Sequence, residues 1–80
     1  MKDFDELAGR LDAVAQAMLT LAAQLEAGAL IDGPQLCAAW RARRAPADAS
    51  AAHAAALLRT MAHLADELDQ ARAVRRSRAR

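Results

Sequence analysis

The sequence has very few of the residues that build β-sheets and disulfide-stabilised folds. It contains no Tyr, one Phe, one Trp and one Cys among its 80 residues. A single Cys excludes an internal disulfide, and the Cys and His residues do not have metal-ligand spacing. Because β-branched and aromatic residues are scarce while Ala, the strongest helix former, is abundant, the composition predicts an all-α protein without a metal or cofactor.

Long apolar runs and a targeting segment are also missing. The first ten residues are acidic and hold no apolar segment typical of a secretory signal. The most apolar stretch, residues 13–31, contains Gln16, Gln24 and Glu26 and does not have the pattern of a transmembrane helix. We therefore expect a cytoplasmic protein that makes no membrane contact.

A heptad pattern predicts a first helix over about residues 3–27. Its large apolar residues follow one another at steps of three and four for three heptads, which is the spacing of a helix–helix packing seam. Gly28 follows the last of them and suits the left-handed position after a helix C-terminus. The residues of this seam are Phe4, Leu7, Leu11, Val14, Met18, Leu21 and Leu25.

Two further helices are predicted after this segment. A short helix over about residues 33–45 is indicated by Asp32 as its cap, Pro34 in its first turn and Pro46 after its end. A long helix over about residues 47–76 carries a second seam at steps of three and four, and a basic tail follows at 77–80. The large apolar residues of the second seam are Leu57, Met61, Leu64 and Leu68.

These elements predict a single helical domain over residues 1–80. Two long heptad-patterned helices joined by a short helix favour an antiparallel helical hairpin. Such a hairpin buries little apolar surface alone, so we expect a homodimer that forms a four-helix-type bundle. A monomer closed by the short helix, or a bundle completed by another protein, fits the same pattern.

The charge of the chain is distributed unevenly. The net charge is +1, but residues 1–32 carry −4 and residues 71–80 carry +5. Antiparallel packing predicts that the acidic start of the first helix, which includes Asp3, Asp5, Glu6 and Asp12, lies beside the arginines at the end of the last helix. Alternatively, these arginines bind a polyanion such as nucleic acid. They are Arg72, Arg75, Arg76, Arg78 and Arg80.

The sequence WRARR at residues 40–44 is the second candidate contact site. Trp and Arg are over-represented at the energetic centres of protein interfaces, so these residues form a predicted partner-binding site. Stacking on a base or contact with phosphates is an alternative. A third interpretation is that Trp40 covers the hairpin core while the arginines are solvated. The residues are Trp40, Arg41, Arg43 and Arg44.

No pattern in the chain indicates catalysis. There is no Gly-rich phosphate loop and no nucleophile–base set, and His53 and His63 lie too far apart along one helix to share a metal. We therefore predict a non-enzymatic helical protein–protein interaction module without a small-molecule substrate. It would be an adaptor, co-chaperone or inhibitor, bacterial or phage-encoded, such as an antagonist of a host system. The alternatives are a nucleic-acid-associated protein that uses the arginines, and a structural coiled coil.

Overall fold

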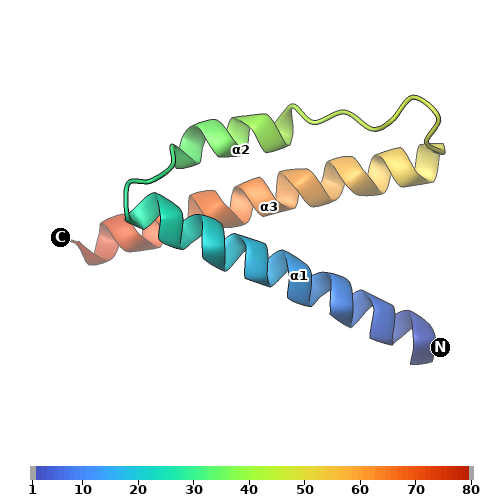
Figure 1. Cartoon of the computed structure of the whole chain (residues 1–80), viewed down its shortest axis with the longest axis horizontal. Helices are drawn as coiled ribbons and strands as arrows, with labels where there is room; N and C mark the ends of the chain where they lie inside the picture. The colour runs from blue at the N-terminus through green and yellow to red at the C-terminus, as the bar shows by residue number, and fades with distance from the viewer. Residues whose placement is uncertain (1, 80) are drawn as a thin grey trace.

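The computed structural model describes residues 2–79, which form three helices and contain no strand (Figure 1). Helix α1 spans Lys2–Ala27, α2 spans Gly33–Arg41 and α3 spans Ala51–Arg78. The predicted all-α class and the short helix between two long ones are both confirmed.

The starts of α2 and α3 are fixed by capping side chains. The Asp32 carboxylate accepts a hydrogen bond from the backbone N–H of Gln35 at 3.0 Å, and Pro34 occupies the first turn of α2, as predicted. The Ser50 hydroxyl accepts a bond from the N–H of His53 at 3.1 Å. Because Ser50 caps α3, that helix begins at Ala51, later than the heptad pattern indicated, and residues 42–50 are not helical.

The C-terminus of α1 ends in a left-handed residue, but that residue is Ala29, not Gly28. Ala29 has φ 59°, whereas no glycine in the described chain has a positive φ. The Leu30 N–H donates to the Leu25 carbonyl at 2.9 Å and the Ala29 N–H donates to the Glu26 carbonyl at 3.0 Å, which is a Schellman ending. Gly28 therefore lies one position before the left-handed residue, and the expectation for Gly28 was wrong by one residue.

Replacing Ala29 with Gly should stabilise the protein by about 1 kcal/mol, because a Cβ is unfavourable in the left-handed region. The urea midpoint should rise with an unchanged dependence on denaturant. Gly28→Ala is the matched comparison, since Gly28 has negative φ and its added Cβ would meet the nearest atom at 3.5 Å, an ordinary contact. A lower midpoint for Ala29→Gly would contradict this assignment.

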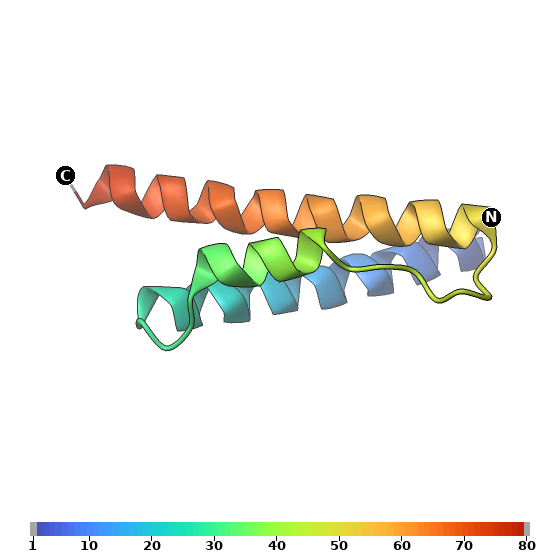
Figure 2. The same cartoon turned by 90° about the horizontal axis from the view of Figure 1, so that it is seen from above.

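The helices are not arranged as the predicted hairpin of two long antiparallel helices. The helix that runs antiparallel along α3 is the short α2, and these two make the most extensive contact. In both views α1 and α3 begin at the same end of the long axis and run toward the other end (Figure 1, Figure 2). The acidic start of α1 therefore lies far from the end of α3, and its predicted pairing with Arg72, Arg75 and Arg76 is wrong.

The connector explains this reversal. The nine-residue α2 rises about 14 Å beside α3, which is roughly 42 Å long. The non-helical residues 42–50 continue along the rest of α3 and include a turn, in which the Ala49 N–H donates to the Pro46 carbonyl at 3.0 Å (Figure 1). Helix α2 and residues 42–50 thus carry the chain back along the whole of α3 before that helix starts. This return leaves α1 and α3 parallel in direction.

The two long helices diverge from one another like the arms of a V (Figure 1). Every described residue before Ala15 is exposed, so α1 packs only through its C-terminal half. The Cα radius of gyration is 14.7 Å, compared with about 12 Å for a folded chain of this length. The core is correspondingly small: it comprises Ala22, Cys37, Ala65 and Leu68, packed against Leu19, Ala23, Leu36 and Trp40.

Candidate functional site

The most prominent surface feature is the seam of α1, which is exposed. Six of its seven residues are 53–71% exposed, and only Leu25 is half-buried. We call these six the apolar α1 face: Phe4, Leu7, Leu11, Val14, Met18 and Leu21. By contrast, Leu57, Met61 and Leu64 of the α3 seam are half-buried, and Leu68 is fully buried. The sequence therefore predicted the seam of α1, but the described chain does not cover it.

Helix α1 meets the other helices through a different side. Its buried and half-buried residues centre on Leu19, Ala22 and Glu26, about a quarter-turn around the helix from the apolar α1 face. The alanines on this side, Ala15, Ala22 and Ala23, let α1 come close to the rest of the fold. The larger side chains point elsewhere and remain available for another contact.

The chain exposes more surface than a monomer of its size normally does. Its accessible surface is 6328 Å² for 8.5 kDa, whereas a folded monomer of that mass has about 4,700 Å². The excess is roughly 1,600 Å², and the splayed α1, whose residues before Ala15 are all exposed, contributes to it. Contiguous apolar surface that remains exposed in this way marks an interaction site.

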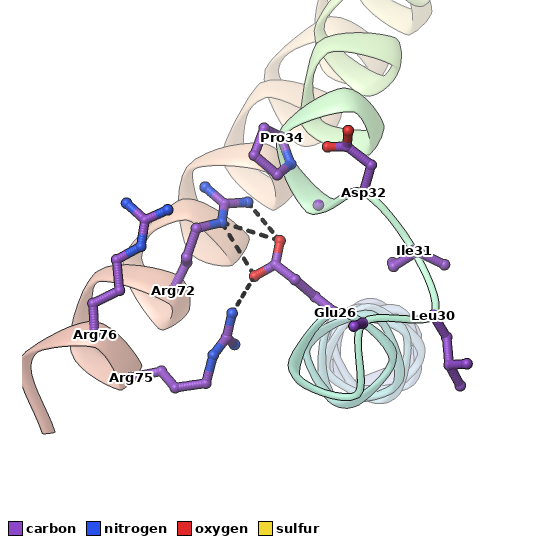
Figure 3. Close-up of a pocket in the computed structure, with 10 residues that line it drawn as sticks. Glu26, Leu30, Ile31, Asp32, Pro34, Arg72, Arg75 and Arg76 are labelled. Atoms are coloured by element: carbon purple, nitrogen blue, oxygen red, sulfur yellow. Dashed lines mark hydrogen bonds and ion pairs between the residues drawn. The ribbon is translucent and has the colours of Figure 1, made fainter. Parts of the chain in front are cut away.

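A second feature is a cluster of charged residues built around Glu26, which holds α1 to α3 (Figure 3). Its carboxylate is 7% exposed and accepts from Arg72 Nη2 at 2.8 Å and Nε at 3.0 Å. Arg75 Nη2 donates to the other carboxylate oxygen at 2.8 Å. The Arg72 side chain is only 12% exposed. Two guanidinium groups thus fix the last turn of α1.

The same cluster extends to α2. Arg72 Nη1 donates to Asp69 at 2.7 Å, and Asp69 also accepts from Arg41 Nη2 at 2.8 Å. Arg41 Nη2 lies 2.7 Å from Asp66 as well. One network of alternating charges therefore joins α1 through Glu26, α2 through Arg41 and α3 through the remaining residues.

Two carboxylates of this network, those of Glu26 and Asp69, have lowered pKa values. Hydrogen bonds from Arg72 lower the pKa of Glu26 below its ordinary value of 4.5, against the opposing effect of burial. Hydrogen bonds from Arg41 and then Arg72 lower the pKa of Asp69 to about 2. Both groups bind protons more weakly in the folded chain than in the unfolded chain.

Stability should therefore fall in acid. The contribution of these carboxylates is complete above the ordinary pKa of 4.5 and should be lost as the pH falls toward about 2. Urea unfolding followed by circular dichroism between pH 7 and pH 2 measures this loss. Glu26→Gln should flatten the dependence, and an unchanged slope in that variant would show that Glu26 does not contribute to it.

Gly33, the first residue of α2, lies against the Glu26 carboxylate. A Cβ at Gly33 would overlap that carboxylate and lie 2.9 Å from Arg72 Nη2. The absence of a side chain at this position therefore lets α1, α2 and α3 meet around the ion pair.

Gly33→Ala should destabilise the chain by about 1–3 kcal/mol, because the new methyl group displaces a carboxylate held by two arginines. In a chain that also carries Glu26→Ala the same substitution should be neutral or slightly stabilising, because Ala favours a helix over Gly by about 1 kcal/mol. A double-mutant cycle by urea unfolding measures this coupling. Strict additivity would contradict the described contact.

The predicted partner-binding residues are divided by the structure. Trp40 packs against the small core and is half-buried, and Arg41 belongs to the Glu26 network. Arg43 and Arg44 are exposed and form no ion pair within the part of the chain that the structure describes. The four residues therefore do not form one exposed surface.

The predicted polyanion-binding arginines are divided as well. Arg72 and Arg75 bind Glu26, while Arg76 and Arg78 are exposed. Arg80 lies outside the described residues. Arg72 and Arg75 thus pair with Glu26 at the end of α1, and Arg72 also pairs with Asp69, instead of with the four acidic residues at the start of α1.

Cys37 lies in the core and is 1% exposed. Its thiol donates to the Ala65 carbonyl at 3.5 Å, and burial raises its pKa. Both effects keep the thiol protonated and unreactive. His53 and His63 are exposed on α3, and among residues 2–79 no group of three ligating side chains is placed to hold a metal.

Sequence reasoning did not identify Glu26 as a functional residue, although one signal was present. An acidic side chain in the last turn of a helix is unfavourable beside the negative pole of the helix dipole. The last turn of α1 has no basic residue to offset it. A carboxylate in that position requires a cation from elsewhere in the fold, which Arg72 and Arg75 provide.

Comparison with known proteins gave no relative. No protein-family model matches the chain, and neither the curated proteins nor the solved structures show a significant similarity to it. None of the helices in residues 2–79 combines the length and apolar character needed to cross a membrane.

Proposed function

We propose that this chain is a non-enzymatic protein–protein interaction module, and that the apolar α1 face is its contact surface. The observation that carries the proposal is that six large apolar side chains at heptad spacing are all more than half exposed. Folded chains bury such a seam against another helix, because its exposure costs roughly 1.5–3 kcal/mol for each fully exposed side chain.

The charged groups support a structural role for the arginines over nucleic-acid binding. Arg41, Arg72 and Arg75 are each bound to carboxylates within the chain. A phosphate would have to displace those carboxylates, so these three arginines contribute little to a polyanion site. The apolar α1 face has no such internal partner among the described residues.

The proposal is tested by placing a photo-crosslinking amino acid, p-benzoylphenylalanine, at position 11 of the full chain, in place of Leu11, in cells that produce this chain. Irradiation should give a discrete covalent adduct with a polypeptide, because Leu11 lies at the middle of the apolar α1 face. The same amino acid at Gln16, which is exposed on the opposite side of α1, is the matched control.

Adducts that form at Leu11 and not at Gln16 support the proposed surface. Adducts must also disappear when Leu7 and Met18 are both replaced with Ser, since both are exposed and their loss leaves the core intact. Absence of any Leu11-specific adduct would overturn the proposed function.

A further inference from the structure

We infer that the partner of the apolar α1 face is a second copy of this chain, which docks its own α1 antiparallel to the first. This inference rests on the proposed function, because it assigns an occupant to the same surface. It differs from the dimer expected from sequence, which paired two complete hairpins. Here only the α1 helices meet.

The spacing of the exposed residues is self-complementary in the antiparallel direction. Antiparallel helices pack the first seam position of each heptad against the fourth position of the other helix. If Leu11 packs against the partner's Val14, Leu7 packs against the partner's Met18 and Phe4 against the partner's Leu21. This register uses all six residues of the apolar α1 face, each of them once.

The flanks of the seam fit this register. Ala8 and Ala15 lie on one side of the seam, and in an antiparallel pair Ala8 faces the partner's Ala15. Small side chains at these positions allow close approach of two helices. The other flank places Asp3 beside the partner's Gln24 and Arg10 beside the partner's Ala17, so no like charges meet.

A parallel pair is less favourable on three grounds. It would bring the acidic starts of both α1 helices, each with Asp3, Asp5 and Glu6, to the same end of the dimer, where like charges repel. Parallel dimers prefer a β-branched residue at the first seam position, but the β-branched Val14 is at the fourth. Parallel docking would also crowd the two α2–α3 bodies at one end of the dimer.

The shape and charge of the molecule favour the antiparallel arrangement. The N-terminal half of α1 projects away from α3, so it can lie beside the C-terminal half of a second α1 while the two bodies occupy opposite ends (Figure 1). The acidic start of α1 and the basic end of α3 lie at opposite ends of the long axis in both views (Figure 2). Antiparallel docking brings the acidic start of each copy to the basic end of the other.

The chain exposes enough surplus surface to accommodate a dimer interface. A standard interface buries about 800 Å² on each partner, and the chain exposes roughly 1,600 Å² more than a monomer of its mass. Docking along the six exposed side chains of the apolar α1 face would bury part of this exposed surface. No rearrangement of the core is needed.

Charged substitutions across the seam test the partner and its direction together. Light scattering and sedimentation of the full chain should give twice the 8.5 kDa chain mass. Leu11→Glu or Val14→Lys alone should weaken dimerisation more than about 100-fold, because each places a charge against an apolar partner. The double variant Leu11→Glu/Val14→Lys should recover to within about tenfold of the wild type. In that variant the introduced carboxylate of each copy faces the introduced ammonium group of the other, so two ion pairs form.

The double variant distinguishes an antiparallel dimer from a parallel one. Recovery in the double variant supports the antiparallel register, because a parallel pair would oppose carboxylate to carboxylate and ammonium to ammonium. If the wild type is a dimer but the double variant dimerises as weakly as the single variants, the antiparallel register is wrong. Gln16→Glu and Gln16→Lys, on the opposite side of α1, should leave the mass unchanged, and circular dichroism of each variant should show retained helix.

A wild-type chain that remains monomeric at all concentrations overturns the inference but not the proposed function. In that case Leu11 adducts in cells would contain another polypeptide. Adducts with the mass of two chains support both proposals, and absence of Leu11 adducts overturns both.

Discussion

Glu26→Gln should lower the free energy of unfolding by about 3–5 kcal/mol, because it breaks a largely buried ion pair, leaves Arg72 with Asp69 alone and takes away the carboxylate that binds Arg75. The Arg72 side chain is 12% exposed and the Glu26 carboxylate is 7% exposed, so solvent does not replace the lost partner. A domain of this size has only about 4–12 kcal/mol of total stability. The substitution should therefore remove a large share of that stability.

Urea unfolding monitored by helical circular dichroism measures this effect. Glu6→Gln is the matched control, since the ion pair between Glu6 and Arg10 lies on the surface with side chains 61% and 74% exposed. That control should change stability little, as solvent-exposed pairs do. Equal effects of the two substitutions would show that the Glu26 network does not hold α1 to the rest of the fold.

Leu68→Ala should cost about 2–5 kcal/mol, because it leaves a cavity in a core that has few members. Leu68 is 0% exposed and is the largest fully buried side chain in the described chain. It packs beside Cys37 and Ala65, small residues that cannot expand to fill the space. The change should lower the melting temperature by about 8 °C or more.

Leu58→Ala provides the comparison on the same helix. Leu58 is 47% exposed, so its truncation removes less contact and should cost well under half as much. Calorimetry or thermal circular dichroism distinguishes the two variants. Similar melting temperatures would mean that the core lies elsewhere along α3.

The helices themselves could be predicted from local chemistry. Abundant Ala, the Asp32 cap and Pro34 act within a few residues of where they stand, so they determine where α2 begins regardless of the rest of the fold. The end of α1 was predicted at the correct residue for the same reason. The left-handed residue is Ala29 instead of Gly28. The Schellman bonds, from Ala29 to Glu26 and from Leu30 to Leu25, require that the residue between Gly28 and Leu30 be left-handed.

The pairing of the helices could not be predicted in the same way. A heptad seam shows that a helix has an apolar side, but it does not show whether that side packs within the chain or against another. The direction of α3 depended on residues 42–50, whose non-helical path returns the chain along α3. Pro46 indicated the end of a helix, but nothing local indicated how far the chain would travel before the next one began.

The candidate surface was visible in the sequence, while the charged network was not. Leu7, Leu11 and Val14 were predicted as a seam from spacing alone, and in the structure all three are exposed, which is why we propose that they need a partner. The network around Glu26 joins residues 46 and 49 positions apart. Contacts of that separation follow from the fold and not from any local pattern.

The attachment of α1 at one end makes this helix a lever. Its pivot is the turn from Ala22 to Glu26, where small side chains and the ion pairs with Arg72 and Arg75 meet. The roughly 20 residues before the pivot extend about 30 Å, so a rotation of about 10° there would move the tip of α1 by about 5 Å. The angle between the two arms can therefore adjust to a docked helix at the cost of a few contacts at the pivot.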